Sequence, residues 1–132
     1  MANSNAARLL IADDDPNILA AYVLFFADHG YDIRTAGDGA GALEEYRSWL
    51  PAVVVLDIQM PSMDGRAVAR EIRLQQINPF PLLVAITALS SPSEQAESIR
   101  SGFDHHFVKP ADLLVVLAAI AAARVGPTAT DA

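Results

Sequence analysis

Four apolar segments of the sequence each lead into side chains that could take part in phosphate chemistry. Three aspartates follow the first segment, from Asp13 to Asp15. A single aspartate, Asp57, follows a β-branched run, and the other two segments lead to a hydroxyl and an ammonium group, Thr87 and Lys109. If the segments are neighbouring parallel strands, their carboxyl ends meet at one rim, where open α/β sheets bind ligands. The sequence therefore predicts one site that combines carboxylates, a hydroxyl and an ammonium group.

Such a set of groups suits the transfer of a phosphoryl group. Clustered carboxylates repel one another, which a hard divalent cation relieves, and Mg²⁺ prefers carboxylate, carbonyl and water oxygens. Lys109 would balance the charge of one phosphate oxygen, and the Thr87 hydroxyl would donate a hydrogen bond to another. Positioning and charge neutralisation are most of what phosphoryl transfer requires, and a carboxylate can act as the covalent acceptor. We therefore expect a phosphoryl-transfer site that uses Mg²⁺.

The elements that must position these residues form a fivefold alternation of strand and helix. Apolar runs such as Val53–Leu56 suit buried parallel strands. Helices are expected to begin at capping residues such as Asp15 and to end at glycines such as Gly30. Five βα units with short connections predict a flavodoxin-like parallel sheet of order 2-1-3-4-5, with helices on both faces. The expected strands are 9–12, 31–35, 53–56, 82–86 and 104–108, and the expected helices are 16–29, 42–50, 66–75, 92–101 and 113–124.

Composition and charge narrow the class of protein. The chain has 132 residues, 52% of them hydrophobic, and no cysteine, which predicts one globular domain without disulfides or thiolate metal sites. Its net charge of −7 repels a phosphate backbone, so direct nucleic-acid binding is not expected. The longest apolar run, Leu113 to Ala123, is much shorter than the ~20 residues that span a membrane. With no signal peptide recognised at the N-terminus, we expect a cytoplasmic protein that makes no membrane contact.

Four motifs carry a resemblance to a known family. In the order and at the spacing found here, they resemble the signature segments of response-regulator receiver domains of two-component signalling. The similarity extends over roughly residues 8–124, so we expect a disordered N-terminus at 1–7, a receiver domain at 8–125, and a tail or linker start at 126–132. The motifs are Leu10-Ile11-Ala12-Asp13-Asp14-Asp15-Pro16, Val55-Leu56-Asp57-Ile58-Gln59-Met60-Pro61-Ser62-Met63-Asp64-Gly65, Ile86-Thr87-Ala88 and Val108-Lys109-Pro110.

The resemblance implies a role for each matching residue. Asp57 resembles the phosphoacceptor and is also expected to be a ligand of the Mg²⁺ ion. Asp14 resembles the direct metal ligand and Asp13 the acid that holds metal-bound waters, while the backbone carbonyl of Gln59 is expected as a further ligand. Two further positions, Thr87 and Lys109, match the phosphate-binding pair, and Thr87 is also expected to take part in the switch. The Lys109–Pro110 peptide matches a bond that is usually cis in the family.

The sequence departs from the family pattern near its last strand. His106 takes the switch position, which is commonly Tyr or Phe, and Ala111 stands where Phe is frequent. The stretch Gly102–Pro110 is similar to receivers attached to hybrid sensor kinases. Leu89, two residues after Thr87, is apolar and cannot orient an attacking water, so slow self-dephosphorylation is expected although Gln59 is polar.

Simpler explanations compete at several positions. Asp15 is expected only to cap a helix, and Asp64 only to belong to the turn at Gly65. His105 and His106 could suggest a transition-metal site, but adjacent strand residues point to opposite faces. One exposed and one packed histidine is therefore the favoured interpretation.

Three functions remain open on the sequence alone. The favoured one is a phosphoacceptor that takes its phosphoryl group from a histidine kinase or histidine phosphotransfer protein and is not otherwise an enzyme. The second is a Mg²⁺-dependent aspartyl-phosphate phosphatase, whose nucleophile would follow the first strand. The third is a degenerate receiver that only mediates contacts, against which the complete set of site residues argues.

The last helix suggests where a partner would bind. Leu113, Val116, Leu117 and Ile120 have the spacing of a core-facing stripe, which leaves Leu114 and Val115 outside it. In the receiver family the surface of the fourth helix, fifth strand and fifth helix is a common partner surface. A homodimer or a kinase module is the expected occupant, and the alternative is a helix that only packs deeply within the monomer.

Overall fold

The computed structural model describes the backbone of residues 6–131 and the side chains of residues 6–123. Five parallel strands form one sheet in the order β2-β1-β3-β4-β5, which confirms the predicted flavodoxin-like α/β fold. The strands are β1 (Arg8–Ala12), β2 (Asp32–Ala36), β3 (Val53–Leu56), β4 (Leu82–Thr87) and β5 (His105–Val108). The helices are α1 (Pro16–Asp28), α2 (Gly39–Trp49), α3 (Gly65–Gln75), α4 (Pro92–Ser101) and α5 (Leu113–Asp131).

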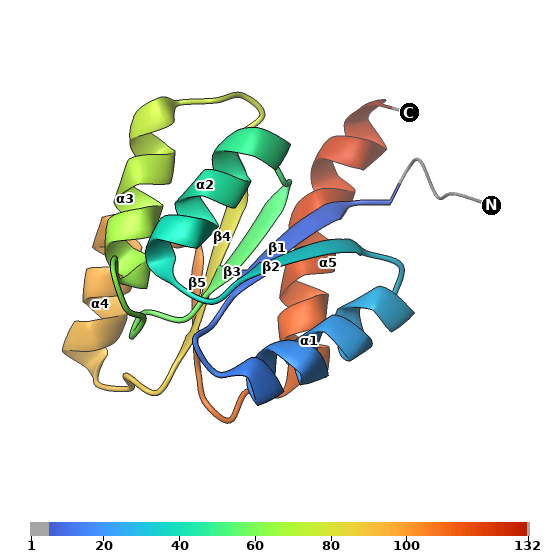
Figure 1. Cartoon of the computed structure of the whole chain (residues 1–132). Coiled ribbons are helices and arrows are strands. Elements are labelled where there is room, and N and C mark those ends of the chain that lie inside the picture. Colours follow the sequence, from blue (N-terminus) through green and yellow to red (C-terminus); the bar gives the residue numbers. More distant parts are fainter. Residues whose placement is uncertain (1–5, 132) are drawn as a thin grey trace.

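The helices cover the two faces of the sheet unequally. Helices α1 and α5 lie on one face, and α2, α3 and α4 lie on the other (Figure 1). Side chains of successive strand residues point to opposite faces, so each strand contributes to two cores. On β1, for example, Leu10 packs toward α2 and α3, while Leu9 and Ile11 pack toward α1 and α5. All four residues of β3 are buried, as the apolar run predicts for a central parallel strand.

Polar caps fix where the helices begin. The side chain of Asp15 accepts hydrogen bonds from the amides of Asn17 and Ile18, which confirms its capping role. Asp64 likewise accepts from the amide of Ala67 at the start of α3. These two aspartates stabilise helix ends and are distinct from the carboxylates at the strand ends.

The last helix is longer than the sequence predicts. We expected its end near Arg124, yet the helical backbone runs to Asp131, so the expected tail from 126 is helical as far as it is described. The alanine-rich stretch before Arg124 favours such continuation, because alanine is the best helix former. The predicted core stripe on α5 is confirmed: Val116 and Ile120 are fully buried. Residues 1–5 of the predicted disordered N-terminus lie outside the described residues.

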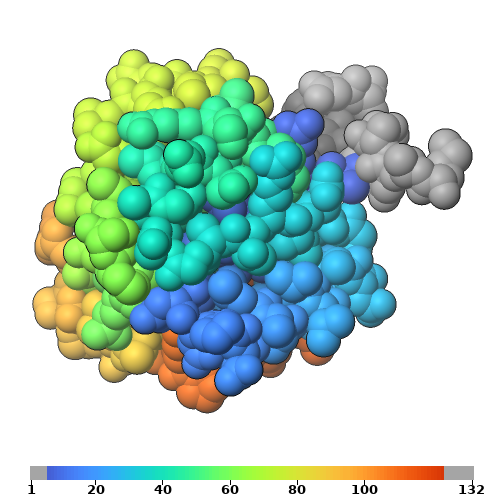
Figure 2. All heavy atoms as spheres, viewed as in Figure 1, coloured from blue at the N-terminus to red at the C-terminus, as the bar shows by residue number. Residues whose placement is uncertain are grey.

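In the view of Figure 2, atoms of α1, β2 and α2 lie in front of the central strands. Within the described part of the chain, every helix is too short or too polar to cross a membrane.

Candidate functional site

The strand ends predicted to meet do meet. Ala12, the last residue of β1, pairs with Leu56 of β3, and Leu56 pairs with Ala85 of β4. The residues that follow these strands therefore come to one rim of the sheet. On the outer pair, Thr87 lies beside Val108, which directly precedes Lys109.

Three carboxylates gather at this rim. One oxygen from each of Asp13, Asp14 and Asp57 lies within 4.8 Å of the others. Asp13 and Asp57 are almost fully buried, with 2% and 6% of their surfaces exposed, whereas Asp14 faces solvent. Buried carboxylates need polar partners, and here backbone amides supply part of them. Oδ1 of Asp13 accepts from the amide of Asp15 at 2.9 Å, and Oδ1 of Asp57 accepts from the amide of Gln59 at 3.2 Å.

Lys109 bridges the two buried carboxylates. Its Nζ lies 2.9 Å from Oδ2 of Asp13 and 2.9 Å from Oδ2 of Asp57. Burial lowers the pKa of the Lys109 ammonium, but the hydrogen bonds and charges of Asp57 and Asp13 more than offset this, so the pKa lies above its ordinary value. Lys109 is the only lysine in the sequence. The site therefore contains a fixed positive charge placed between two carboxylates.

Thr87 is fully buried at the end of β4. Its Oγ1 accepts a long hydrogen bond, 3.4 Å, from the amide of Leu89, and its carbonyl accepts from the amide of Lys109 at 2.8 Å. In this contact the Thr87 hydroxyl acts as an acceptor, so its own hydrogen can be donated to a ligand. The Lys109–Pro110 peptide is cis, as the resemblance predicts.

The donor set fits a hard divalent cation. Carboxylate oxygens are preferred Mg²⁺ ligands, and one exposed carboxylate beside two buried ones leaves a path for a hydrated ion. Asp13, Asp14 and Asp57 would hold the ion. The side chain of Gln59 is exposed, so its backbone carbonyl is the part of that residue expected to take part.

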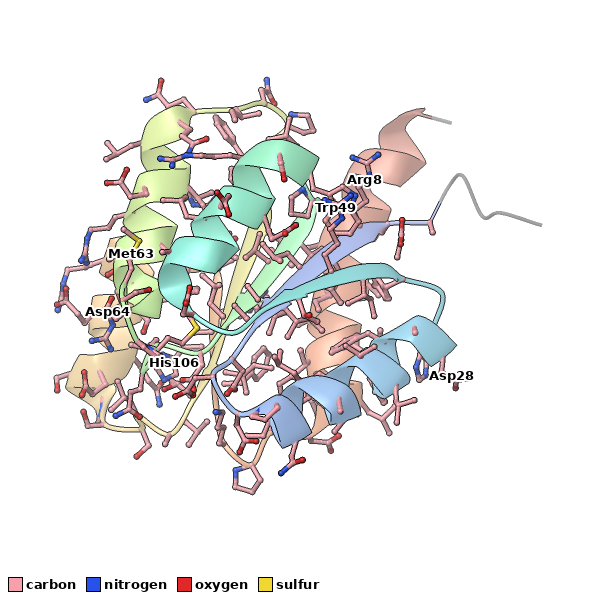
Figure 3. The ribbon with its side chains drawn as sticks, viewed as in Figure 1. Arg8, Asp28, Trp49, Met63, Asp64 and His106 are labelled. Carbon is pink, nitrogen blue, oxygen red and sulfur yellow. The ribbon has the colours of Figure 1, made fainter. Side chains whose placement is uncertain are left out.

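His106 lies in a hydrogen-bonded chain between β5, α4 and the loop after β4. Its Nε2 lies 2.7 Å from the carbonyl oxygen of Leu89, and its Nδ1 lies 2.8 Å from Oγ of Ser98. The Ser98 hydroxyl is fully buried and also accepts from the guanidinium of Arg66 on α3 at 3.4 Å. Figure 3 labels His106 on the side of the molecule where α3 and α4 lie. His106 thus makes polar contacts with two neighbouring elements.

The two histidines of β5 differ less in burial than the sequence predicts. Both are partly buried, so the expectation that one of them is exposed is wrong. Their rings do point to opposite faces: His105 stacks on Phe107 with ring centroids 5.9 Å apart, while His106 faces α4. Neither belongs to a metal-ligating cluster among the described residues.

Sequence reasoning missed several residues around the site. Three arginines of α3 reach across to α4 and the segment after it. Arg66 contacts Ser98 and Glu94, and Arg70 contacts Ser101. A basic stripe at i, i+4 and i+7 was the available signal, completed by Arg73, which donates to the carbonyls of Gly102 and Pro81 and to the carboxylate of Asp104.

Tyr22 of α1 is a second omission. Burial raises the pKa of its hydroxyl above the ordinary value; the Lys109 ammonium lowers it, and the charges of Asp13 and Asp57 raise it further. This phenol therefore lies within electrostatic range of the carboxylate cluster. In the sequence, Tyr22 only continues the apolar face of this helix, which indicates a core residue and gives no sign of the carboxylates nearby.

Comparison with known proteins agrees with the geometry. Residues 9–121 match the family model described as the response regulator receiver domain. The transcriptional regulatory protein PrrA of Mycobacterium leprae is 35% identical over 129 residues, which cover 96% of this chain and 54% of that protein. The transcriptional regulatory protein PhoP of Bacillus subtilis is 31% identical over 103 residues, covering 78% of this chain and 42% of that protein. The chain thus spans about half the length of these relatives.

Solved structures show the same architecture. The receiver domain of the Francisella response regulator 1452 has a TM-score of 0.81 and 30% identity, covering 86% of this chain and 93% of its own. The chemotaxis protein CheY4 of Vibrio cholerae has a TM-score of 0.80 and 28% identity, with coverages of 87% and 96%. The two relatives named above are transcriptional regulators, so the resemblance to hybrid-kinase receivers stays a prediction.

Proposed function

Because this chain belongs to the response-regulator receiver family, we propose that it accepts a phosphoryl group on Asp57. The donor is a phosphohistidine of a histidine kinase or of a histidine phosphotransfer protein. The observation that carries the proposal is the position of Asp57, whose Oδ2 lies 2.9 Å from Lys109 inside a cluster of three carboxylates. Receiver domains generally act as phosphoacceptors with weak self-dephosphorylation, and no other substrate is proposed.

Each site residue has a part in the transfer. An oxygen of the Asp57 carboxylate forms the new bond to phosphorus while the bond from phosphorus to the donor nitrogen breaks. Lys109 balances the negative charge of the phosphoryl oxygens, and the Thr87 hydroxyl donates a hydrogen bond to one of them. Mg²⁺, when held by Asp13, Asp14, Asp57 and the Gln59 carbonyl, supplies further charge neutralisation. His106, with Thr87, carries the change of state to α4.

A phosphatase would place its nucleophile on the residue after β1, which is Asp13. Asp13 shares Lys109 with Asp57, so geometry alone does not separate the two carboxylates. Asp57 is favoured because it follows the central strand, β3. It therefore lies between the aspartates that follow β1 on one side and Thr87 and Lys109, at the ends of β4 and β5, on the other. The degenerate receiver is disfavoured because all five site residues are present at the rim.

Labelling with acetyl phosphate tests the proposal. Incubation with Mg²⁺ should add one phosphoryl group by intact mass, and Asp57→Asn should remove the label. Asp15→Asn is the matched control, because Asn also caps helices and Asp15 serves only as a cap. EDTA should abolish labelling. Full labelling of Asp57→Asn would refute the proposal, and label recovered on Asp13 would favour the phosphatase.

The partner surface is proposed from exposed apolar residues around α4, β5 and α5. Leu114 is 63% exposed, and Val115, Ile99 and Val108 are also exposed. The stretch from Leu113 to Ala123 carries no charge. Phosphorylation would alter this surface through His106, which lies on β5 and contacts α4. A second copy or a kinase module is the proposed occupant, and direct nucleic-acid and membrane contacts are not proposed.

A further inference from the structure

The loop after β3 is tightly folded on itself. It runs from Ile58 to Gly65 and contains the backbone of Gln59. The amides of Met60 and Gly65 both donate to the carbonyl of Ile58, at 3.1 and 2.8 Å, so the two ends of the loop are joined. Ser62 within it has a φ of 67°, a left-handed conformation that is uncommon for a residue with a side chain.

The same loop supplies hydrogen-bond acceptors for the amides at the start of α2. The first four amides of a helix have no partner within the helix. In α2 the first, Gly39, donates to the carbonyl of Pro61 at 3.3 Å, and the second, Ala40, donates to Oγ of Ser62 at 3.2 Å. The third, Gly41, donates to the side chain of Asp38, and Ala42 makes the first ordinary helical bond, to the Asp38 carbonyl. Two of the three amides that precede that bond therefore find their acceptors in the loop from Ile58 to Gly65.

The contact requires a residue without a side chain. A Cβ on Gly39 would lie 1.7 Å from the carbonyl oxygen of Met63 and 2.5 Å from its carbonyl carbon, which are backbone atoms that cannot rotate away. Gly37, two residues earlier, differs completely, because a Cβ there meets nothing within 4 Å. Figure 3 labels Met63 near the N-terminal end of α3, beside α2. Of these two glycines, only Gly39 occupies a position where the fold has no room for a side chain.

The loop ends at the phosphoacceptor. A Cβ on Gly65 would lie 2.3 Å from the carbonyl oxygen of Asp57, so the last residue of the loop packs directly on the backbone of that aspartate. Because the Gly65 amide donates to the Ile58 carbonyl, opening the loop costs this hydrogen bond. We therefore expect a displacement of Met63 to move the segment that holds Gln59.

We propose that Gly39 and Ser62 are positioning residues for the phosphorylation site, acting through the loop from Ile58 to Gly65. They fix the backbone of Gln59 and, with it, the carboxylate of Asp57, which accepts from the Gln59 amide. This inference rests on the proposed function, because it assigns these residues a part in metal binding and phosphoryl acceptance.

Two alanine variants form a matched pair. Gly39→Ala pushes on Met63, whereas Gly37→Ala adds the same atom in open space. Mg²⁺ affinity is measured by calorimetry, and the labelling rate with acetyl phosphate is measured beside it. Gly39→Ala should weaken Mg²⁺ binding about tenfold, the range found when the outer supports of a metal site are lost. Gly37→Ala should bind Mg²⁺ as the wild type does.

Ser62→Gly tests the same contact in a variant that keeps the fold. Glycine suits a positive φ, so the change removes the hydroxyl that receives the Ala40 amide without straining the backbone. Mg²⁺ affinity should fall about fivefold, as expected for one lost hydrogen bond. Amide exchange at Ala40, followed by NMR without Mg²⁺, should become faster in this variant.

The outcomes separate the two proposals. A wild type that binds no Mg²⁺ and takes no label overturns both. A labelled wild type with unchanged Mg²⁺ affinity in Gly39→Ala and Ser62→Gly overturns the positioning role alone. Loss of thermal stability without any change in Mg²⁺ affinity also overturns it, because a purely structural contact would behave in that way. If Gly39→Ala does not fold, Ser62→Gly decides.

Discussion

Nε2 of His106 lies 2.7 Å from the carbonyl oxygen of Leu89, two residues beyond Thr87. A carbonyl only accepts hydrogen bonds, so Nε2 must carry the hydrogen. In the neutral ring Nδ1 is then an acceptor, and it accepts a hydrogen bond from the Ser98 hydroxyl. The Ser98 oxygen in turn accepts a hydrogen bond from the guanidinium of Arg66. The chain of donors therefore runs in one direction, from α3 through α4 and β5 to the loop beside the site.

The first prediction concerns the hydrogen bonds of His106. His106→Phe fills a similar volume but removes both hydrogen bonds, leaving the buried Ser98 hydroxyl and the Leu89 carbonyl without that partner. The free energy of unfolding, measured with urea, should fall by about 1–3 kcal/mol. His105→Phe is the control, because that ring stacks on Phe107 and a phenyl ring preserves the stack. Equal stabilities for the two variants would contradict the hydrogen-bond assignment.

The second prediction concerns the lifetime of the phosphoryl group. Leu89 is apolar and partly buried beside the site, and its amide donates to Thr87. Leu89→Ser should shorten the lifetime by about an order of magnitude, because a hydroxyl can orient an attacking water. Decay of the phosphorylated mass after removal of acetyl phosphate gives the rate, and Leu89→Ala controls for the smaller volume. A serine variant whose lifetime matches that of the alanine variant would count against the role of the hydroxyl.

The third prediction is an alkaline loss of stability. The pKa of Lys109 is raised in the folded state, so below pH ~10.4 both folded and unfolded chains carry the proton and the stabilisation is complete. As the pH rises further toward the folded value, the unfolded chain loses its proton first, and the stabilisation is lost. In EDTA, the free energy of unfolding should fall on the order of 1 kcal/mol between pH 10 and 11.

Lys109→Met isolates the contribution of the lysine from that of the tyrosines. Burial raises the pKa of Tyr22, and of Tyr46 too, so both phenols also cost stability at high pH. Because the chain has no other lysine, the variant should retain only the tyrosine part of the decline. An equally steep decline in the variant would show that Lys109 does not contribute.

The fourth prediction concerns the exposed surface of α5. If phosphorylation promotes pairing of two copies through α4, β5 and α5, beryllium fluoride with Mg²⁺ should convert the protein from monomer to dimer in sedimentation. Leu114→Glu would place a charge in that interface and weaken association about tenfold or more. Leu24→Glu is a matched control, since Leu24 is also exposed but lies on α1. A monomer in every sample would remove the homodimer and leave a kinase module as the occupant.

The sequence predicts the parts of the site that depend on strand ends. A parallel sheet has only one carboxyl edge, so the sequence alone predicts that four strand-end residues lie together: Asp13, Asp57, Thr87 and Lys109. It also predicts Asp15 as a cap, because a cap is a local contact. The links from Arg66 to Ser98 and from Gly39 to Met63 join residues more than 20 positions apart on different helices and loops. No local pattern encodes such pairs. Gly37 and Gly39 both stand beside Asp38, and nothing in the sequence shows that an added Cβ would clash with Met63 at Gly39 and meet open space at Gly37.

The single tryptophan has a consequence for spectroscopy. Trp49 ends α2, whose 11 residues carry it roughly 15 Å from the loop of residues 58–65 at the other end of that helix. The guanidinium groups of Arg8 and Arg34 lie 5.6 and 4.8 Å from its ring centroid, and Figure 3 labels Arg8 beside it. Its fluorescence should therefore change when the sheet opens on unfolding and stay constant when Mg²⁺ or a phosphoryl group binds. Trp49 is therefore expected to report on folding without reporting on metal binding or phosphorylation.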